Sequence, residues 1–461
     1  MAKLVLERVN PSKSALFFVS VLLASLGTPA WVWWLGPVAA SLAYGIFFSL
    51  ILAEDATSRS RFRLAFLWFF IVQGFQWGWF ATPEFQGYYI YGAWAALMSL
   101  WALQFALFSV VLGWWGVANL RHVFALAGLW TVLEYSRLYV LTGSTFNPVG
   151  MALASTLPSL QFASLLGIYG LCFWVILCNL LAVRAYKQFS YVALRMWVCV
   201  AVVPYLYGTG QLMWLEAREK ELPKRSIGVA LVQTASPPIE FLDPKDRANL
   251  FDYALHKWQV ILGDLKALQK EELDLVVLPE SSVPYGTQFP AYTHESVLST
   301  FDAFFGIHGI EALPPLEAPL AKKYIYGGEE VWLVTNLYWA QALANLYSAD
   351  VVLGLEHHEV AAEGERAKAF NSAVRVQPRN GGTERYDKHL LLPMGEYIPS
   401  QWLAGIAAQY GVYASFAPGQ SVPVFVHPKI PYAISICYEE TFSGFISSSC
   451  RKGARLLVNV T

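Results

Sequence analysis

Ala433-Ile-Ser-Ile-Cys437-Tyr-Glu-Glu440 places a cysteine at the end of an apolar run, and two carboxylates follow it directly. A short apolar run with β-branched residues is typical of a buried strand, so we expect Cys437 at a strand end. Free cysteine is among the most buried residue types and usually packs as a small apolar group. The stretch therefore predicts a strand that ends on a thiol, and Cys437 is either a packing residue or a nucleophile.

Two other apolar runs end on groups that complement a thiol. Val276-Val-Leu-Pro-Glu280 ends on a carboxylate, and Tyr386-Asp-Lys388 ends on a lysine. Acyl transfer by cysteine needs a base for the thiol and a cation or N–H donors for the oxyanion. Taken singly, Glu280 has the alternative of a helix cap and Lys388 that of a solvated charge. Together with Cys437, they form a candidate acyl-transfer site.

The composition divides the chain into two parts. Its 461 residues are too many for one ordinary domain, and 56% are hydrophobic while only 14% are charged, against about 25% charged in typical soluble domains. Charged residues are sparse before residue 215 and common after it, which predicts a transmembrane helical domain over 1–215 and a second domain over 216–461. The net charge of −1 gives no indication of a nucleic-acid partner.

The five cysteines do not form a recognisable ligand or disulfide set. Three of them, at positions 172, 178 and 199, lie in the apolar half, where packing is the ordinary role. None is spaced as in a paired metal motif. We therefore expect neither a metal site nor a diffusible cofactor, and no disulfide framework.

Seven apolar segments in the first half approach the length that a membrane helix needs, about 20 residues. They are residues 14–35, 37–53, 64–81, 89–111, 122–141, 160–183 and 191–214. The loops on one side hold basic residues, and the alternate loops hold none; the basic residues are Lys3, Arg8, Lys13, Arg59, Arg61, Arg63, Arg121, Arg184, Lys187 and Arg195. The positive-inside rule then predicts a cytoplasmic amino terminus and an extracytoplasmic second domain.

Glu134 and Arg137 are charged residues inside the fifth predicted span. Their spacing of three residues permits an ion pair on one helix, which would let the span tolerate both charges. Charged groups within a membrane span also often mark a functional site. Both interpretations stay open at this point.

The second half alternates short apolar strands with helical patterns, which predicts an α/β sandwich. Residues 243–269 have apolar side chains at helical spacing, and residues 329–348 are predicted to be helical as well. Residues 281–324 are rich in proline and aromatic residues and show no secure periodicity, so we expect a long loop there, either functional or a plain surface insertion.

The order of Leu278-Pro-Glu280, Tyr386-Asp-Lys388-His and Ile436-Cys437-Tyr-Glu439 resembles the Glu-Lys-Cys triad of the nitrilase (carbon-nitrogen hydrolase) superfamily. The continuation after the lysine, Pro393-Met-Gly-Glu396-Tyr-Ile-Pro399, and the preceding membrane helices are similar to the apolipoprotein N-acyltransferase family. The resemblance extends over nearly the whole chain, including Asn371-Ser-Ala373 and Pro418-Gly419. It implies an α-helical membrane domain followed by a nitrilase-like sandwich.

The resemblance also implies an activity. Members of this family complete lipoprotein maturation in the bacterial inner membrane. By this resemblance, Cys437 takes an acyl chain from a membrane phospholipid as a thioester, and the amino-terminal amine of an apolipoprotein's diacylglyceryl-cysteine receives it. Glu280 would be the base and Lys388 the oxyanion cation, while Glu396, Tyr438 and Glu439 would support the site.

Two departures from the family pattern bear on this expectation. Gly143-Ser-Thr-Phe-Asn-Pro148 stands where the family has a Gly-Phe-Pro-Trp-like loop. Val458-Asn-Val-Thr461 matches the start of a family segment that continues into further strands and an eighth membrane helix, so we expect an incomplete carboxy-terminal part. A membrane-tethered amidase of the nitrilase type and an inactive relic of the acyltransferase are the alternative functions.

Overall fold

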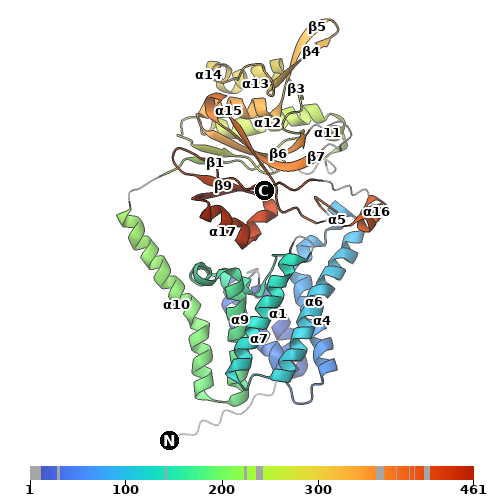
Figure 1. Ribbon diagram of the computed structural model, residues 1–461, viewed down its shortest axis with the longest axis vertical. Coiled ribbons are helices and arrows are strands. Elements are labelled where there is room, and N and C mark those ends of the chain that lie inside the picture. Colours follow the sequence, from blue (N-terminus) through green and yellow to red (C-terminus); the bar gives the residue numbers. More distant parts are fainter. Residues whose placement is uncertain are drawn as a thin grey trace. The chain divides into compact units, whose positions relative to one another are not determined.

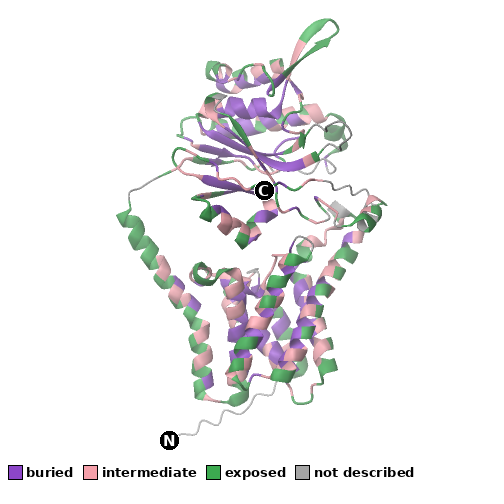
Figure 2. Ribbon diagram, viewed as in Figure 1, coloured by how far each residue is buried: buried purple, intermediate pink, exposed green. Residues whose placement is uncertain are grey.

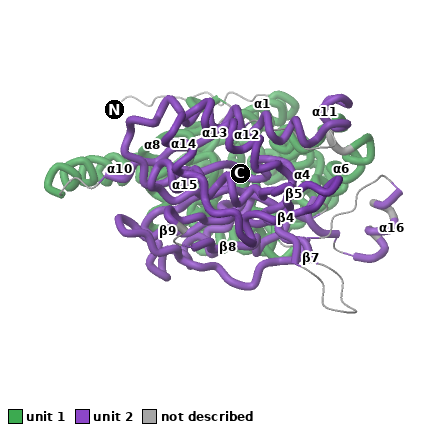
Figure 3. Tube along the Cα trace, turned by 90° about the horizontal axis from the view of Figure 1, so that it is seen from above, with its two compact units in different colours: residues 1–223 green, residues 224–461 purple. Residues whose placement is uncertain are grey.

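The computed structural model describes residues 12–28, 32–140, 143–222, 226–234, 242–359, 368–380, 382–393, 395–398, 400–409 and 416–461. Lys3 and Arg8, which contribute to the predicted orientation, lie outside these ranges. The chain forms two compact units, residues 1–223 and 224–461 (Figure 3). Helix α10 (Tyr191–Glu221) continues past residue 215, where the sequence predicts the domain boundary, and ends at Glu221.

The regular elements described in the first unit are all helices (Figure 1). Side-chain caps explain where several begin: Thr57 and Ser60 exchange hydrogen bonds at the start of one helix, and Asn119 accepts from the amide of Arg121 at the start of another. The α-helices besides α10 are α1 (Lys13–Gly27), α2 (Gly36–Val38), α3 (Tyr44–Ile51), α4 (Ser58–Gln76), α5 (Pro83–Gln86), α6 (Tyr89–Trp115), α7 (Leu120–Ser136), α8 (Leu157–Gln161) and α9 (Ala163–Gln188).

Four helical segments in the described part of the chain are long and apolar enough to cross a membrane: Trp33–Ile51, α6, α9 and α10. The other three predicted spans fall on helices α1, α4 and α7. Helix α1 is apolar but has only 15 residues, and α7 has 17. Helix α4 begins with three arginines in its first six residues. The membrane character of the first unit is thus evident, while a count of seven crossings remains a prediction.

The core of the first unit is aromatic. The ring of Phe105 stacks on those of Trp68 and Phe69, and Trp130 meets Phe105 edge-on. Beside them lies a buried ion pair, one of the two interpretations of these residues, with Arg137 Nη1 3.7 Å from Glu134 Oε1. In contrast, only 17% of the most apolar 18-residue stretch of α10 is buried within the chain. Figure 2 shows this helix as largely exposed.

The second unit contains a mixed five-stranded sheet in the order β1-β2-β6-β7-β8. Strands β1, β2 and β6 are parallel, whereas β6, β7 and β8 are antiparallel neighbours. A parallel pair β9–β10 and an antiparallel trio β3-β5-β4 complete the strands. Their bounds are β1 (Val229–Leu231), β2 (Leu275–Val277), β3 (Tyr292–Thr293), β4 (Ala321–Tyr326), β5 (Glu329–Val334), β6 (Asp350–Glu359), β7 (Lys368–Val376), β8 (Thr383–Asp387), β9 (Tyr432–Ile436) and β10 (Leu456–Val460).

Each face of the five-stranded sheet is covered. Helices α12 (Leu250–Lys266) and α15 (Asn336–Tyr347) cover one face (Figure 1). Trp258 and Trp339 from these two helices stack in parallel at 5.3 Å. Helix α13 (His294–Phe305) packs against α12 and against strands β3 and β5. Strands β9 and β10 cover the other face, so that Ile434 and Val460 pack against Val277 and Val352. The remaining helices are α11 (Pro244–Ala248), α14 (Ile307–Glu311), α16 (Gln401–Gln409) and α17 (Ser443–Arg451). The α/β sandwich predicted from the sequence is therefore correct.

Two local predictions are wrong. Residues 329–348 are not one helix, because β5 occupies the first six of them and pairs with β4 across the turn at Gly327-Gly328. Residues 281–324 are not a single loop, since they contain α13, α14 and most of β4. In the first segment, pairing of β5 with β4 outweighs the helical pattern. In the second, α13 is stabilised by the burial of Phe301 and Phe305 in the core, where Phe301 packs against Trp339.

Candidate active site

Glu280, Lys388 and Cys437 each follow the end of a strand, as the sequence predicts. Glu280 comes three residues after β2, and Lys388 and Cys437 directly follow β8 and β9. The amide of Lys388 donates to the carbonyl of Asn371 at 2.8 Å, which continues the β7–β8 ladder by one residue. The lysine therefore has a backbone position fixed by the sheet.

The Lys388 ammonium is buried between two carboxylates. Its Nζ lies 2.7 Å from Glu396 Oε1 and 3.5 Å from Glu280 Oε1. Burial alone would lower the pKa of Lys388, but the negative charges of Glu280 and Glu396 outweigh it and raise this pKa above its usual value. The site thus holds a permanent positive charge at neutral pH.

Asn371, on β7, is a fourth member of this group. Its side-chain amide donates to Glu280 Oε1 at 2.5 Å and to Glu396 Oε1 at 2.7 Å. Both carboxylates are therefore oriented by the same amide and the same ammonium. The sequence comparison with the nitrilase pattern includes Asn371, yet it does not predict a site role. The available signal is a polar residue in the middle of a buried strand, where an amide needs partners.

Glu396 also stabilises the loop that carries it. Its Oε2 accepts from the amide of Leu392 at 2.7 Å, and its own amide donates to the Leu392 carbonyl at 2.9 Å. These two hydrogen bonds join Leu392 to Glu396, whose other carboxylate oxygen contacts Lys388. The supporting role that the family resemblance implies for Glu396 stays a prediction.

Cys437 is half-buried and has a φ of +53°, a left-handed conformation that is uncommon for a non-glycine residue. Burial and the negative charge of Glu280 raise the pKa of the Cys437 thiol, and the positive charge of Lys388 lowers it only in part. The net direction is upward, so the thiol is protonated at neutral pH and needs a base before it can act as a nucleophile.

Glu439 and Tyr438 have different surroundings. Glu439 is fully buried and accepts hydrogen bonds from the Tyr386 hydroxyl and from three backbone amides, those of His389, Leu390 and Ile436, at 2.7–3.0 Å. It therefore ties the segment after Lys388 to the strand before Cys437. Tyr438 is buried with its ring edge-on to Phe442 at 4.9 Å, and burial raises the pKa of its phenol, which stays neutral.

Gly354 on β6 allows the Glu280 segment to approach the sheet. A Cβ atom at this position would lie 2.6 Å from Glu280 Cα and 2.8 Å from the Pro279 carbonyl oxygen. It would also lie 2.8 Å from Val460 Cγ1, on the opposing strand β10. No side chain fits in this contact, so the position of Glu280 depends on a glycine.

Two family models match this chain. Residues 228–461 match the carbon-nitrogen hydrolase family, and residues 19–181 match the apolipoprotein N-acyltransferase N-terminal domain. The second unit is accordingly a carbon-nitrogen hydrolase domain, which is the class that its sandwich and its sequence define.

The curated relatives narrow this class. An apolipoprotein N-acyltransferase of Chlamydia trachomatis serovar D is 31% identical over 91% of this chain and 72% of its own length. The enzyme of the same name from Chlamydia muridarum is 30% identical over 91% of this chain and 73% of its own length. That of Chlamydia pneumoniae is 28% identical over 96% of this chain and 78% of its own length. The chain belongs to the apolipoprotein N-acyltransferase family.

Proposed function

We propose that this protein transfers a fatty acyl chain from a membrane phospholipid to the amino-terminal amine of an apolipoprotein's diacylglyceryl-cysteine, through a thioester on Cys437. The observation that carries the proposal is the group formed by Glu280, Lys388, Glu396 and Asn371, joined by contacts of 2.5–3.5 Å. Membership of the apolipoprotein N-acyltransferase family supports the choice of donor and acceptor.

In the first half-reaction Glu280 takes the proton of the Cys437 thiol, and the sulfur attacks the carbonyl carbon of the acyl ester. The tetrahedral oxyanion is stabilised by the ammonium of Lys388, whose charge is secured by the two carboxylates. Collapse of the intermediate breaks the ester C–O bond. The proton moves from Glu280 to the leaving alkoxide, and a lysophospholipid departs while the acyl chain stays on sulfur.

In the second half-reaction the acceptor amine attacks the thioester carbonyl. Glu280 receives a proton from the amine, and the C–S bond breaks as the amide forms. The thiolate regains a proton from Glu280, because its raised pKa favours the neutral thiol. The cycle ends with every group of the protein in its starting state, which is the ping-pong pattern of covalent catalysis.

The supporting residues have distinct tasks in this proposal. Glu396 keeps Lys388 charged and directed toward Glu280, and Asn371 orients both carboxylates. Glu439 is a positioning residue, since its contacts reach Tyr386 and backbone amides. The predicted location is the bacterial inner membrane, with the amino terminus cytoplasmic and the second unit periplasmic, where both lipid-anchored substrates are present.

The test is direct detection of the acyl-enzyme. Purified protein incubated with phospholipid alone is expected to gain the mass of one acyl chain on the peptide containing Cys437, and neutral hydroxylamine should remove it. Cys437→Ala is expected to abolish the adduct, while Cys450→Ala, which changes an exposed cysteine of the same unit, serves as the matched control.

Two outcomes would contradict the proposal. An adduct that survives in Cys437→Ala would exclude this cysteine as the nucleophile. Turnover of small amides without any accumulated acyl-enzyme would instead favour the membrane-tethered amidase. Addition of a diacylglyceryl-cysteine peptide should discharge the acyl chain as an amide.

A further inference from the structure

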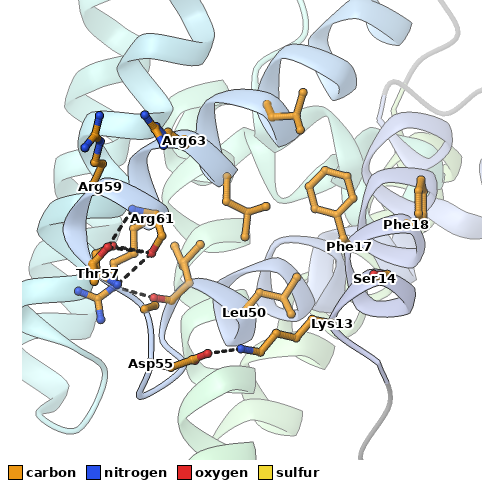
Figure 4. Close-up of a pocket in the computed structure, with 15 residues that line it drawn as sticks. Lys13, Ser14, Phe17, Phe18, Leu50, Asp55, Thr57, Arg59, Arg61 and Arg63 are labelled. Atoms are coloured by element: carbon orange, nitrogen blue, oxygen red, sulfur yellow. Dashed lines mark hydrogen bonds and ion pairs between the residues drawn. The ribbon is translucent and has the colours of Figure 1, made fainter.

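The first unit contains a cavity of about 750 Å³ (Figure 4). It is lined by the beginning of α1, the end of α3 and the first half of α4, together with residues 55–57 between the last two. Its volume is within the range of about 300–1,000 Å³ that is usual for small-molecule sites. All of its lining residues belong to one unit, so its shape is defined by that unit alone.

One end of the cavity is strongly basic. Lys13, Arg59, Arg61 and Arg63 line it, and Asp55 is the only acidic residue among the described residues of its lining. Lys13 is paired with Asp55, and Arg61 Nε donates to the Ile51 carbonyl at 2.7 Å. Arg59 and Arg63 are exposed, and within the described ranges neither has a hydrogen bond or ion pair. Two guanidinium groups, four residues apart on α4, are thus available to an anion.

The other end of the cavity is apolar. Phe17 and Phe18 follow Lys13 by one turn of α1, and Leu64 and Leu67 follow Arg63 along α4. Phe18 and Leu67 are 65% and 50% exposed. On an apolar helix bundle such side chains face the acyl chains of the bilayer. The lining therefore changes from cationic to apolar along both helices.

We propose that this cavity binds an anionic glycerophospholipid, with its phosphate on Arg59 and Arg63 and its acyl chains along Phe17, Phe18 and Leu67. The excess of positive charge supports an anionic ligand, and guanidinium groups match the geometry of phosphate oxygens. The apolar half, open to the membrane, supports a lipid over a free anion. The loop charges predict that this end faces the cytoplasmic leaflet, where clustered basic residues beside a helix are typical of anionic-lipid recognition.

The experiment uses the full chain in mixed micelles of dioleoyl phosphatidylglycerol and dioleoyl phosphatidylcholine in equal amounts. Native mass spectrometry then counts the retained lipids, and the wild type is expected to retain phosphatidylglycerol preferentially. The double substitution Arg59→Gln/Arg63→Gln should lower this preference by about tenfold or more, since each basic residue near the headgroup contributes to binding. Both side chains are exposed, so the thermal unfolding temperature should be unchanged.

The matched control is Arg121→Gln/Arg195→Gln, which removes two exposed arginines that the sequence predicts on the same side of the membrane and that do not line the cavity. It should keep the preference within roughly twofold, because the charge effect falls off over a Debye length. Equal retention of both lipids by the wild type would overturn the proposal. So would an equal loss in both double variants, or displacement of phosphatidylglycerol by an equivalent concentration of glycerol 3-phosphate, which would identify a plain phosphate site.

Discussion

Lys388 is a single cation beside two carboxylates and the Cys437 thiol. This excess of acidic groups over positive charge determines which of them keeps its proton. Its Nζ contacts Glu396 and Glu280 at 2.7 and 3.5 Å, so it stays charged. Full ionisation of Cys437 would add a third negative charge near a single positive one. The thiol is consequently kept neutral until a substrate arrives, and Glu280 is needed as the base.

The opposite influences of Glu280 and Lys388 on the thiol give a first prediction. Glu280 raises the pKa of Cys437, so Glu280→Gln should lower it and shift thiolate formation to lower pH. Alkylation of Cys437 by iodoacetamide at neutral pH should then be faster by about threefold to tenfold. Acyl-enzyme formation should fall in the same variant, because the base is gone.

Lys388→Met is the complementary variant. Lys388 lowers the pKa of Cys437, so its removal should shift alkylation to higher pH and slow it at neutral pH. The measurement is the pH profile of Cys437 alkylation by peptide mass, which separates it from the exposed Cys199 and Cys450. If Glu280→Gln slows alkylation, the carboxylate does not oppose thiol ionisation and the charge argument is wrong.

Glu280, Lys388 and Cys437 could be singled out from the residues alone, because each follows an apolar run and together they supply a base, a cation and a thiol. Glu396, Tyr438 and Glu439 do not follow from this pattern and are expected only from the family resemblance. Asn371 has a different position, inside β7, where only its three-dimensional partners Glu280 and Glu396 reveal its task. Local sequence contains no information about a contact between residues 91 positions apart.

At the scale of elements, β6 limits how closely Glu280 can approach the sheet. Gly354→Ala should place a Cβ 2.6 Å from Glu280 Cα and displace the carboxylate from Lys388 and Asn371. We expect acyl-enzyme formation to fall by about a hundredfold, the effect of a misplacement of roughly 1 Å. Overpacking should also cost about 1–3 kcal/mol in the free energy of unfolding.

Gly444→Ala is the control for this prediction, since nothing lies within 4 Å of a Cβ there and the residue is in helix α17. It should leave the rate of acyl-enzyme formation unchanged and should not lower the unfolding temperature. A Gly354→Ala variant as active as the wild type would show that Glu280 tolerates the displacement.

The elements themselves were predictable where their pattern is strong. The helix pattern over residues 243–269 corresponds to α11 and α12. Strand β5 was missed because its short alternating segment runs directly into α15, and a local pattern does not show the pairing with β4. The turn at Gly327-Gly328 is a hairpin signal that the sequence does contain, so this strand was within reach of sequence reasoning.

At the scale of the whole molecule, the loop charges predict that the second unit is outside the cytoplasm. A membrane-impermeant maleimide should label the exposed Cys450 in intact spheroplasts, in a chain whose Cys199 and Cys437 are replaced by alanine. A second variant has Cys199, Cys437 and Cys450 replaced by alanine and carries Arg121→Cys, a position predicted to face the cytoplasm. This cysteine should react with the maleimide only after the cells are permeabilised. Labelling of Cys450 solely in permeabilised cells would mean that the predicted orientation is inverted.

The contacts of Glu439 have a consequence for how the site opens. This one carboxylate accepts hydrogen bonds from the amides of His389 and Leu390, which follow Lys388, and from the amide of Ile436, which precedes Cys437. Excursions in which the protein transiently opens involve contiguous cooperative segments. Because the same buried acceptor joins both segments, a fluctuation that frees the lysine also frees the cysteine. Lys388 and Cys437 therefore leave their positions in the site together. The protein then does not populate a state in which Cys437 is in place without the nearby ammonium.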